Sequence, residues 1–317
     1  MNLPLISVVI ATWNRKDDLK EALEKYLNNS YKNIEIIVVD NNSTDGTKNM
    51  VVRDFKDVKL ISLSENTGVK AYNIGIKEAK GDIIYLSDND AYLEEDGFFK
   101  IVNKFQNGSV NLAVISCEIV YIPQNIIYEW YSRPIDRNNI NPNGYEAHLF
   151  IGAGAAIKRE VFKKVGYYDE SFFLFFNENE LSTRIIGAGY DIKYFPDIKV
   201  YHKTSSKRYP NRTRYLTVRN MIWYYWKYFP IHIAFGRTII RLPFECIISL
   251  YHRIRIFEIF KTIYDTFNGL PNIIKNREPI PKKYVKKALR YENVFQDIFH
   301  WIQETQKRRK QLKNNSW

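Results

Sequence analysis

Residues 83–90 read Ile-Ile-Tyr-Leu-Ser-Asp-Asn-Asp, a short apolar run that ends in two carboxylates one residue apart. Such a run is typical of a buried parallel strand, whose two faces are both covered. Asp88 and Asp90 then leave the strand on a turn, where both can approach one hard cation. Mg²⁺ or Mn²⁺ commonly takes one or two carboxylates together with phosphate oxygens of a substrate. Turns are rich in aspartate, so the surrounding segments decide between a metal site and an ordinary turn.

Strand and helix patterns alternate around this stretch. Apolar, β-branched runs predict further strands at 6–11, 34–39, 58–63, 111–121 and 198–202. Amphipathic spacing predicts helices at 16–28, 44–55 and 69–79, and a short helix within the loop that reaches residue 143. Alternation at this spacing indicates βαβ units, and therefore an α/β, Rossmann-like fold with a mostly parallel sheet flanked by helices.

The predicted strands end in polar residues, where such sheets bind their ligands. The first strand is followed by Thr12-Trp13-Asn14-Arg15 and the third by Ser64-Glu65-Asn66-Thr67-Gly68. The glycine of the second segment serves either a plain loop or a close approach of backbone to a ribose or diphosphate. Asp40 at the end of the second strand is either a turn former or an acceptor for the imide N–H of uracil or thymine.

Several blocks of the chain resemble, in order, the blocks of family 2 glycosyltransferases. They are ISVVIATWNR (6–15), IIVVDNNSTDGT (36–47), NTGVKAYNIGIKEAKG (66–81) and IIYLSDND (83–90), with further matches at 152–162, 165–170 and 172–190. The resemblance covers about residues 5–205. It implies the GT-A fold and an inverting transfer of a sugar from a UDP- or dTDP-sugar, and bacterial rhamnosyltransferases share the layout.

The resemblance also implies roles for single residues. Asp40 would pair with the base, Asp88 would face the ribose, and Mg²⁺ or Mn²⁺ would be bound by Asp90 and His202. His202 follows a predicted strand, where a structural histidine is equally expected. The remaining donor-binding residues implied are Thr12, Asn14, Arg15, Asn66, Lys70 and Asn89.

The general base is expected near the start of the segment 175–184, FFNENELSTR. The family carries a Glu-Asp pair there, whose second carboxylate takes the proton of the acceptor hydroxyl. Aligned on Leu181 and Arg184, Glu178 takes that place, and Asn177 replaces the preceding Glu. Glu180 lies two residues further on and is the alternative. A capping or salt-bridged carboxylate is the structural interpretation of Glu178.

Charge divides the chain into two parts. Residues 1–202 carry 23 Lys and Arg against 28 Asp and Glu, a net of −5, and residues 203–317 carry 24 against 7, a net of +17. We therefore expect a catalytic domain over 1–208 and a basic, aromatic, helical region over 209–317. Lys203 and the segment Ser205-Ser206-Lys207-Arg208 are expected to form a flexible lid whose cations meet the diphosphate.

The basic region is suited either to an anionic membrane surface or to a helical cap with snorkelling arginines. Nucleic-acid binding is not expected, because no recognition fold is visible. The two cysteines lack ligand spacing, and the chain shows neither a signal peptide nor an apolar run long enough to span a bilayer. The expected location is cytoplasmic, on the inner face of the cell membrane.

The sequence thus predicts a metal-dependent glycosyltransferase that acts on a hydroxyl of a saccharide or lipid-linked acceptor in cell-surface glycan synthesis. Two alternatives stay open at this point. A sugar-nucleotide nucleotidyltransferase also uses a parallel sheet and metal-binding carboxylates, but it needs a glycine-rich loop after the first strand, where Thr12-Trp13-Asn14-Arg15 stands. A non-catalytic glycan-binding protein is the other, and it is disfavoured because Asp90, Glu178 and Glu180 are all present.

Overall fold

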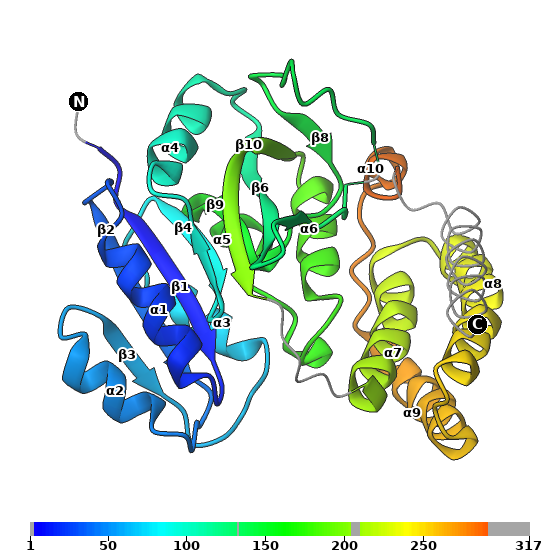
Figure 1. Cartoon of the computed structure of the whole chain (residues 1–317). Helices are drawn as coiled ribbons and strands as arrows, with labels where there is room; N and C mark the ends of the chain where they lie inside the picture. The colour runs from blue at the N-terminus through cyan, green and yellow to red at the C-terminus, as the bar shows by residue number, and fades with distance from the viewer. Residues whose placement is uncertain (1–2, 132, 204–209, 291–317) are drawn as a thin grey trace, which may run out of the picture. The chain divides into compact units, whose positions relative to one another are not determined.

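The computed structural model describes residues 3–131, 133–203 and 210–290, and Figure 1 shows the course of the chain. The chain divides into two compact units, residues 1–208 and 209–317. Residues 205–208, the expected lid, and the charged tail 307–313 lie outside the described residues.

The first unit alternates strands and helices over its first ninety residues, as the apolar pattern predicts. These elements are β1 (Ile6–Thr12), α1 (Lys16–Leu27), β2 (Ile34–Asp40), α2 (Thr47–Asp54), β3 (Lys59–Ser62), α3 (Lys70–Glu78) and β4 (Ile83–Asp88). The rest of the unit consists of β5 (Ala91–Leu93), α4 (Gly97–Asn107), β6 (Leu112–Ile122), β7 (Ile126–Ile127), β8 (Tyr145–Ala147), η1 (Gly152–Gly154), β9 (Ala155–Lys158), α5 (Arg159–Val165), η2 (Glu170–Phe172), α6 (Asn177–Gly187) and β10 (Asp191–Lys203).

One sheet runs through the unit in the order β3-β2-β1-β4-β9-β6-β10-β5. The first four strands pair in parallel, with Val8 of β1 opposite Ile36 on one side and Tyr85 on the other. Beyond them the sheet is mixed, since β9 is antiparallel to both β4 and β6, while β10 is parallel to β6. The β10–β6 register shifts between Phe195 and Lys199, a segment that contains Pro196, which has no N–H to donate.

Helices cover both faces of the sheet. On one face Tyr26 of α1 packs against Tyr85 of β4 and Phe98 of α4, at ring-centroid distances of 6.1 Å each. On the other face α3 approaches so closely that a Cβ at Gly75 would lie 2.5 Å from the Val9 side chain. The strand ends that carry the candidate site residues are therefore held between two packed layers.

Two expected helices differ from the structure. The helix expected from residue 44 begins at Thr47, because Asp45 accepts the backbone N–H groups of Lys16 and Thr47 and Gly46 takes a φ of 87°. No helix forms between residues 123 and 143, among which all but residue 132 are described. That segment is interrupted by three prolines, and it contributes the short strand β7.

The second unit consists of four described helices, α7 (Pro210–Tyr228), α8 (Ile231–Tyr251), α9 (Ile256–Lys275) and α10 (Lys282–Ala288). Two indole N–H groups join the first three. Trp223 donates to the carbonyl of Thr266 in α9, and Trp226 donates to the hydroxyl of Thr238 in α8, both at 2.9 Å. In the described parts of the chain, no helix combines the length and the apolar character that crossing a bilayer requires.

Candidate active site

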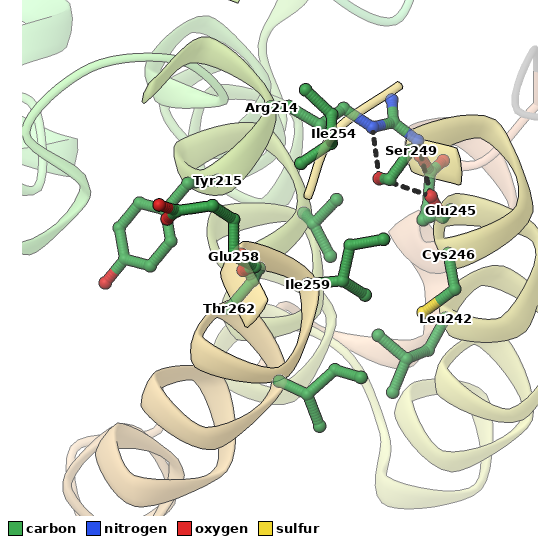
Figure 2. Close-up of a pocket in the computed structure, with 12 residues that line it drawn as sticks. Arg214, Tyr215, Leu242, Glu245, Cys246, Ser249, Ile254, Glu258, Ile259 and Thr262 are labelled. Atoms are coloured by element: carbon green, nitrogen blue, oxygen red, sulfur yellow. Dashed lines mark hydrogen bonds and ion pairs between the residues drawn. The ribbon is translucent and has the colours of Figure 1, made fainter. Parts of the chain in front are cut away.

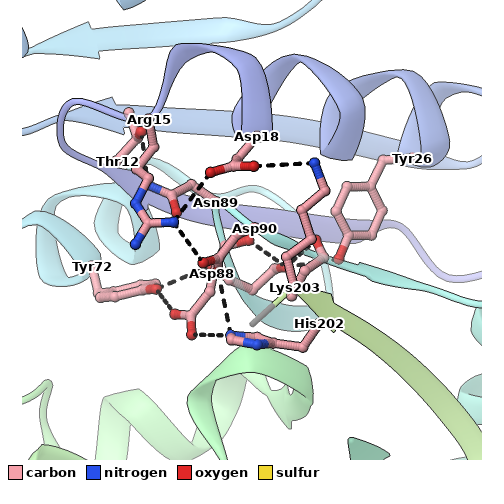
Figure 3. Close-up of polar contacts among 12 residues, drawn as sticks. Thr12, Arg15, Asp18, Tyr26, Tyr72, Asp88, Asn89, Asp90, His202 and Lys203 are labelled. Carbon is pink, nitrogen blue, oxygen red and sulfur yellow. Dashed lines mark hydrogen bonds and ion pairs between the residues drawn. The ribbon is translucent and has the colours of Figure 1, made fainter. Parts of the chain in front are cut away.

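Asp88, Asp90 and His202 meet at the end of the sheet, as Figure 3 shows. Asp88 is the last residue of β4 and Asp90 follows in the turn before β5. The antiparallel pairing of β5 with β10 sets His202 opposite Ala91, so its imidazole lies beside the turn. His202 Nε2 is 3.4 Å from Asp88 Oδ2 and 3.3 Å from Asp90 Oδ1. One potential ligand atom from each residue lies within 4.8 Å of the other two.

The charges within this group shift the pKa values of Asp90 and His202. Burial and the charge of Asp88 together raise the pKa of Asp90. Burial alone would lower the pKa of His202, but its hydrogen bond to Asp88 and the charges of both aspartates outweigh burial and raise it. Two carboxylates and an imidazole are ligands that fit Mn²⁺ or Mg²⁺, and a bound cation relieves repulsion between the carboxylates. The residues present therefore fit the expected metal.

Arg15 lies with this group. Its Nη1 is 3.2 Å from Asp90 Oδ2 and 3.1 Å from Asp18 Oδ2. Asp18 also pairs with Lys203 at 3.1 Å, and Lys203 reaches Glu21 at 2.6 Å. Lys203, the residue of the expected lid that the structure describes, is thus paired with two acidic residues of helix α1. Asp18 and Glu21 were not expected from the sequence, although their place in the first turns after β1 puts them at the same end of the sheet.

Two further contacts fix the Asp88–Asp90 turn. Asn89 donates to the hydroxyl of Thr12 at 3.0 Å, which joins the ends of β4 and β1. The hydroxyl of Tyr72, in α3, donates to Asp88 Oδ1 at 3.0 Å. Tyr72 was missed by the sequence reasoning, because nothing in the spacing of an apolar helix face singles out one tyrosine as a partner of a distant carboxylate.

Asn14 and Asp40 lie together at a neighbouring turn. Asn14 Oδ1 accepts the N–H of Thr44 at 2.7 Å, and Asp40 Oδ1 accepts the N–H of Ser43 at 3.1 Å. Asp40 is buried, with 2% of its surface exposed. Both side chains therefore shape the 40–44 turn, which is the structural interpretation that the sequence left open for Asp40.

Asn66 and Lys70 belong to a different loop. Asn66 Oδ1 accepts the N–H of Gly68 at 3.0 Å, and Lys70 lies 3.5 Å from Glu170. Asn41, which the sequence reasoning did not select, accepts the N–H of Thr67 at 3.0 Å and so ties this loop to the end of β2. The contacts of Asn66 and Lys70 do not include the Asp88, Asp90 and His202 group.

Glu178 and Glu180, the two candidate bases, lie in different surroundings at the start of α6. Glu180 is fully buried, accepts the Asp169 N–H at 2.8 Å and forms an ion pair of 2.6 Å with Arg184. Burial of the Glu178 carboxyl, together with the charge of Asp88, raises its pKa to about 7 against backbone hydrogen bonds that lower it. Of the two glutamates, Glu178 thus combines a raised pKa with a carboxylate that forms no ion pair within the described part of the chain.

The carboxylate of Glu178 rests against Gly152. A Cβ at that glycine would lie 2.9 Å from Glu178 Oε1. The chain before α6 is strained, since Phe173, Phe175 and Phe176 all have positive φ, which bulky residues rarely adopt. The carbonyl of Phe173 accepts the Val69 N–H at 2.6 Å, so this strained segment is joined to the start of α3.

Solved structures share the fold of this chain. The structure of mannosyltransferase PcManGT from Pyrobaculum calidifontis, in complex with GDP-Man and Mn²⁺, matches 87% of this chain and 73% of its own, with a TM-score of 0.54 and 21% identity. The fold is accordingly GT-A. dTDP-rhamnosyl transferase RfbF of Shigella flexneri is 26% identical over 64% of this chain and 70% of its own.

The Escherichia coli UDP-Glc:alpha-D-GlcNAc-diphosphoundecaprenol beta-1,3-glucosyltransferase WfaP is 38% identical over 28% of this chain and 37% of its own. The first three curated relatives are matched over 43% to 54% of their length, so the chain spans about half of them. The family model described as glycosyl transferase family 2 matches residues 7–166, about half of the chain. On this match and on the order of its sequence blocks, the chain belongs to glycosyl transferase family 2.

Proposed function

We propose that this glycosyltransferase is metal-dependent and inverting, and that it moves a sugar from a UDP- or dTDP-sugar to a hydroxyl of a saccharide or lipid-linked acceptor in cell-surface glycan synthesis. The observation that carries the proposal is the meeting of Asp88, Asp90 and His202 at the end of the sheet, with Glu178 charge-coupled to Asp88. Family membership removes the nucleotidyltransferase alternative, and the enzyme class removes the non-catalytic one.

Each residue has a part in the proposed reaction. Asp88, Asp90 and His202 would hold Mg²⁺ or Mn²⁺, whose chemistry is to neutralise the negative charge of a departing diphosphate. Glu178 takes the proton from the acceptor hydroxyl as that oxygen attacks the anomeric carbon, and the bond to the diphosphate breaks in the same displacement. One displacement inverts the anomeric centre and needs no covalent intermediate.

The donor nucleotide is assigned from two sources. The relatives RfbF and WfaP are named for dTDP-rhamnose and UDP-glucose chemistry respectively. Asp40 lies at the end of β2 with Oδ1 bonded to the Ser43 N–H, and we assign Oδ2 to the imide N–H that uracil and thymine both present. Thr12, Asn14, Arg15, Asn66, Lys70 and Asn89 complete the proposed donor site.

We place the enzyme on the cytoplasmic face of the cell membrane. The name of WfaP includes a diphosphoundecaprenol acceptor, which is membrane-bound. Residues 203–317 carry 24 Lys and Arg against 7 Asp and Glu, a balance suited to anionic lipid. An enzyme bound to the membrane surface would then encounter a membrane-bound acceptor by diffusion in the plane of the membrane.

The proposal is tested by product analysis. Purified enzyme is incubated with Mn²⁺ and a panel of UDP-, dTDP- and GDP-sugars, and the released nucleoside diphosphate and the anomeric configuration of the product are measured. We expect turnover with UDP- or dTDP-sugars and an inverted product. Turnover confined to GDP-sugars would remove the assignment of Asp40, and a retained configuration would remove Glu178 as the base.

Replacing Gly152 by Ala is expected to lower kcat about tenfold to a hundredfold. The new Cβ would lie 2.9 Å from the Glu178 carboxylate, which must shift, and small misplacements of a reacting group cost up to about 10²-fold. Gly236→Ala is the matched control, because nothing lies within 4 Å of a Cβ there. Equal kcat in the two variants would show that the position of Glu178 does not limit turnover.

The rate is expected to depend on the protonation of Glu178. A base with a pKa of about 7 accepts a proton only when it is ionised, so kcat should rise about tenfold per pH unit below pH 6 and level off above about pH 8. Donor affinity, measured over the same range, should stay nearly constant. A kcat that is flat between pH 5 and 8 would contradict the assignment.

A further inference from the structure

Helix α8 carries its charges on the inner side. Throughout α8, all of which is described, no exposed residue is Asp, Glu, Lys or Arg, and the exposed residues are Ile231, His232, Phe235, Ile239, Ile240, Pro243, Ile247 and Leu250. Arg237 and Arg241 are partly buried, and Glu245 is buried. A helix on the surface of a water-soluble domain has the opposite distribution.

Contacts with α7 hold the polar side of α8 inward, as Figure 2 shows. Arg214 of α7 forms an ion pair with Glu245 and donates to the hydroxyl of Ser249 at 3.0 Å. Trp226 of α7 donates to Thr238, about two turns before Glu245 in α8. Because these buried groups are paired, α8 cannot rotate to bury its apolar side without breaking a buried ion pair.

Helix α9 has two apolar sides. Ile259, Leu270 and Ile273 are buried within the unit. A second stripe, at helical spacing, is exposed, and it consists of Ile256, Phe257, Phe260, Tyr264, Phe267 and Ile274. Phe257 is 71% exposed, Phe260 64% and Tyr264 68%. Such aromatic exposure along one helix marks an interaction site.

The charges exposed on this pair of helices have one sign. Between residues 231 and 275, all of which are described, the exposed charged side chains are Arg253, Arg255, Lys261 and Lys275. None of the three acidic residues of that range is exposed, and each is bonded, Glu245 to Arg214, Glu258 to Arg255 and Asp265 to the hydroxyl of Tyr215. The exposed surface is therefore apolar and cationic.

We propose that the α8–α9 surface, defined as the exposed residues of 231–275, docks on an anionic lipid layer, with its apolar side chains in the acyl boundary and its cations at the headgroups. Helices that combine an apolar side with Lys and Arg lie in the plane of such an interface. The inference rests on the membrane location proposed above and on no step of the catalytic mechanism. A partner without an apolar surface would leave the exposed apolar side chains of both helices uncovered.

The test is cosedimentation of the full chain with phosphatidylcholine vesicles, with and without phosphatidylglycerol, at low salt. The double variant Phe257→Glu with Phe260→Glu is expected to lose affinity for anionic vesicles by a hundredfold or more, since each buried ring contributes on the order of tenfold or above. The matched control is Val52→Glu with Val110→Glu in the first unit, where the two valines are 61% and 88% exposed. It makes the same change of charge and should bind like the parent.

The cations are tested separately. Arg253→Gln and Lys261→Gln should each weaken binding to anionic vesicles about fivefold and leave the weak binding to neutral vesicles unchanged. The proposal is overturned if the parent ignores anionic vesicles, or if the double phenylalanine variant binds them equally well. A parent that ignores vesicles but forms a dimer, which the double variant dissociates, would assign the surface to a second copy of this chain.

Release of nucleoside diphosphate in solution is measured for every variant and is expected to match the parent. If the parent binds vesicles but shows no turnover, the catalytic proposal fails and the surface proposal stands. Retained turnover with no vesicle binding by the parent would overturn the surface proposal alone.

Discussion

Replacing Glu178 by Gln is expected to lower turnover about 10²–10⁴-fold, the usual contribution of a positioned general base. The amide keeps the size and hydrogen-bonding shape of the carboxylate but cannot accept a proton from the acceptor hydroxyl. Donor affinity should be nearly unchanged, because the proposed nucleotide contacts lie outside helix α6, which carries Glu178. The measurement is kcat with saturating donor and acceptor, together with a calorimetric titration of the donor.

Glu180→Gln provides the contrast two residues away. Glu180 is fully buried and paired with Arg184 at 2.6 Å, so its loss leaves a buried guanidinium without its counter-ion. We expect the free energy of unfolding to fall by about 3 kcal/mol and kcat of the folded enzyme to change little. If instead Glu180→Gln is folded and inactive while Glu178→Gln turns over normally, the base has been assigned to the wrong glutamate.

Asp90→Ala is expected to abolish metal-dependent donor binding and to reduce turnover by 10³-fold or more. Asp90 is buried beside Asp88, and this proximity raises its pKa, so the folded state gains little from the ionised carboxylate. The variant should therefore unfold at a temperature equal to or slightly above that of the parent. Both quantities are measured on one preparation, by donor titration in Mn²⁺ and by thermal unfolding.

Asp18→Asn is the control for this experiment. Asp18 shares Arg15 and Lys203 with the same charge network but is not among the three potential ligands. Its loss should weaken donor binding only severalfold. Full turnover of Asp90→Ala in Mn²⁺, or equal losses in both variants, would remove Asp90 from the metal site.

The first half of the sheet follows from the sequence because each strand there is a continuous apolar run with a helix before the next. The second half does not. β9 is four residues long and enters antiparallel between β4 and β6. Its paired residues lie 69 to 75 positions earlier in β4 and 39 to 43 positions earlier in β6, and no local pattern encodes pairings at those separations. The missing helix before residue 143 has a local cause, since prolines at 123, 134 and 142 interrupt it.

The candidate site, too, could be predicted from the sequence only in part. The family resemblance predicts that Asp90 and His202 lie together, but it turns Asp88 toward the ribose. The register of β10 against β5 brings His202 beside both aspartates. The alignment on Leu181 and Arg184 favours Glu178 over Glu180 as the base, and the proposal keeps this assignment. The two side chains have different surroundings because residues two apart on a helix point to opposite sides. One sequence signal was available, since Glu180 and Arg184 have the i,i+4 spacing of a helical ion pair.

The proposed mechanism requires that the donor binds through a metal held by Asp88, Asp90 and His202. A calorimetric titration of UDP and of dTDP into the full-length enzyme, with Mn²⁺ and then with excess EDTA, tests this directly. We predict that at least one nucleotide binds in Mn²⁺, that EDTA abolishes the binding, and that Asp90→Ala reproduces the EDTA result in the presence of Mn²⁺. Binding of equal affinity in Mn²⁺ and in EDTA would contradict the metal-dependent mechanism.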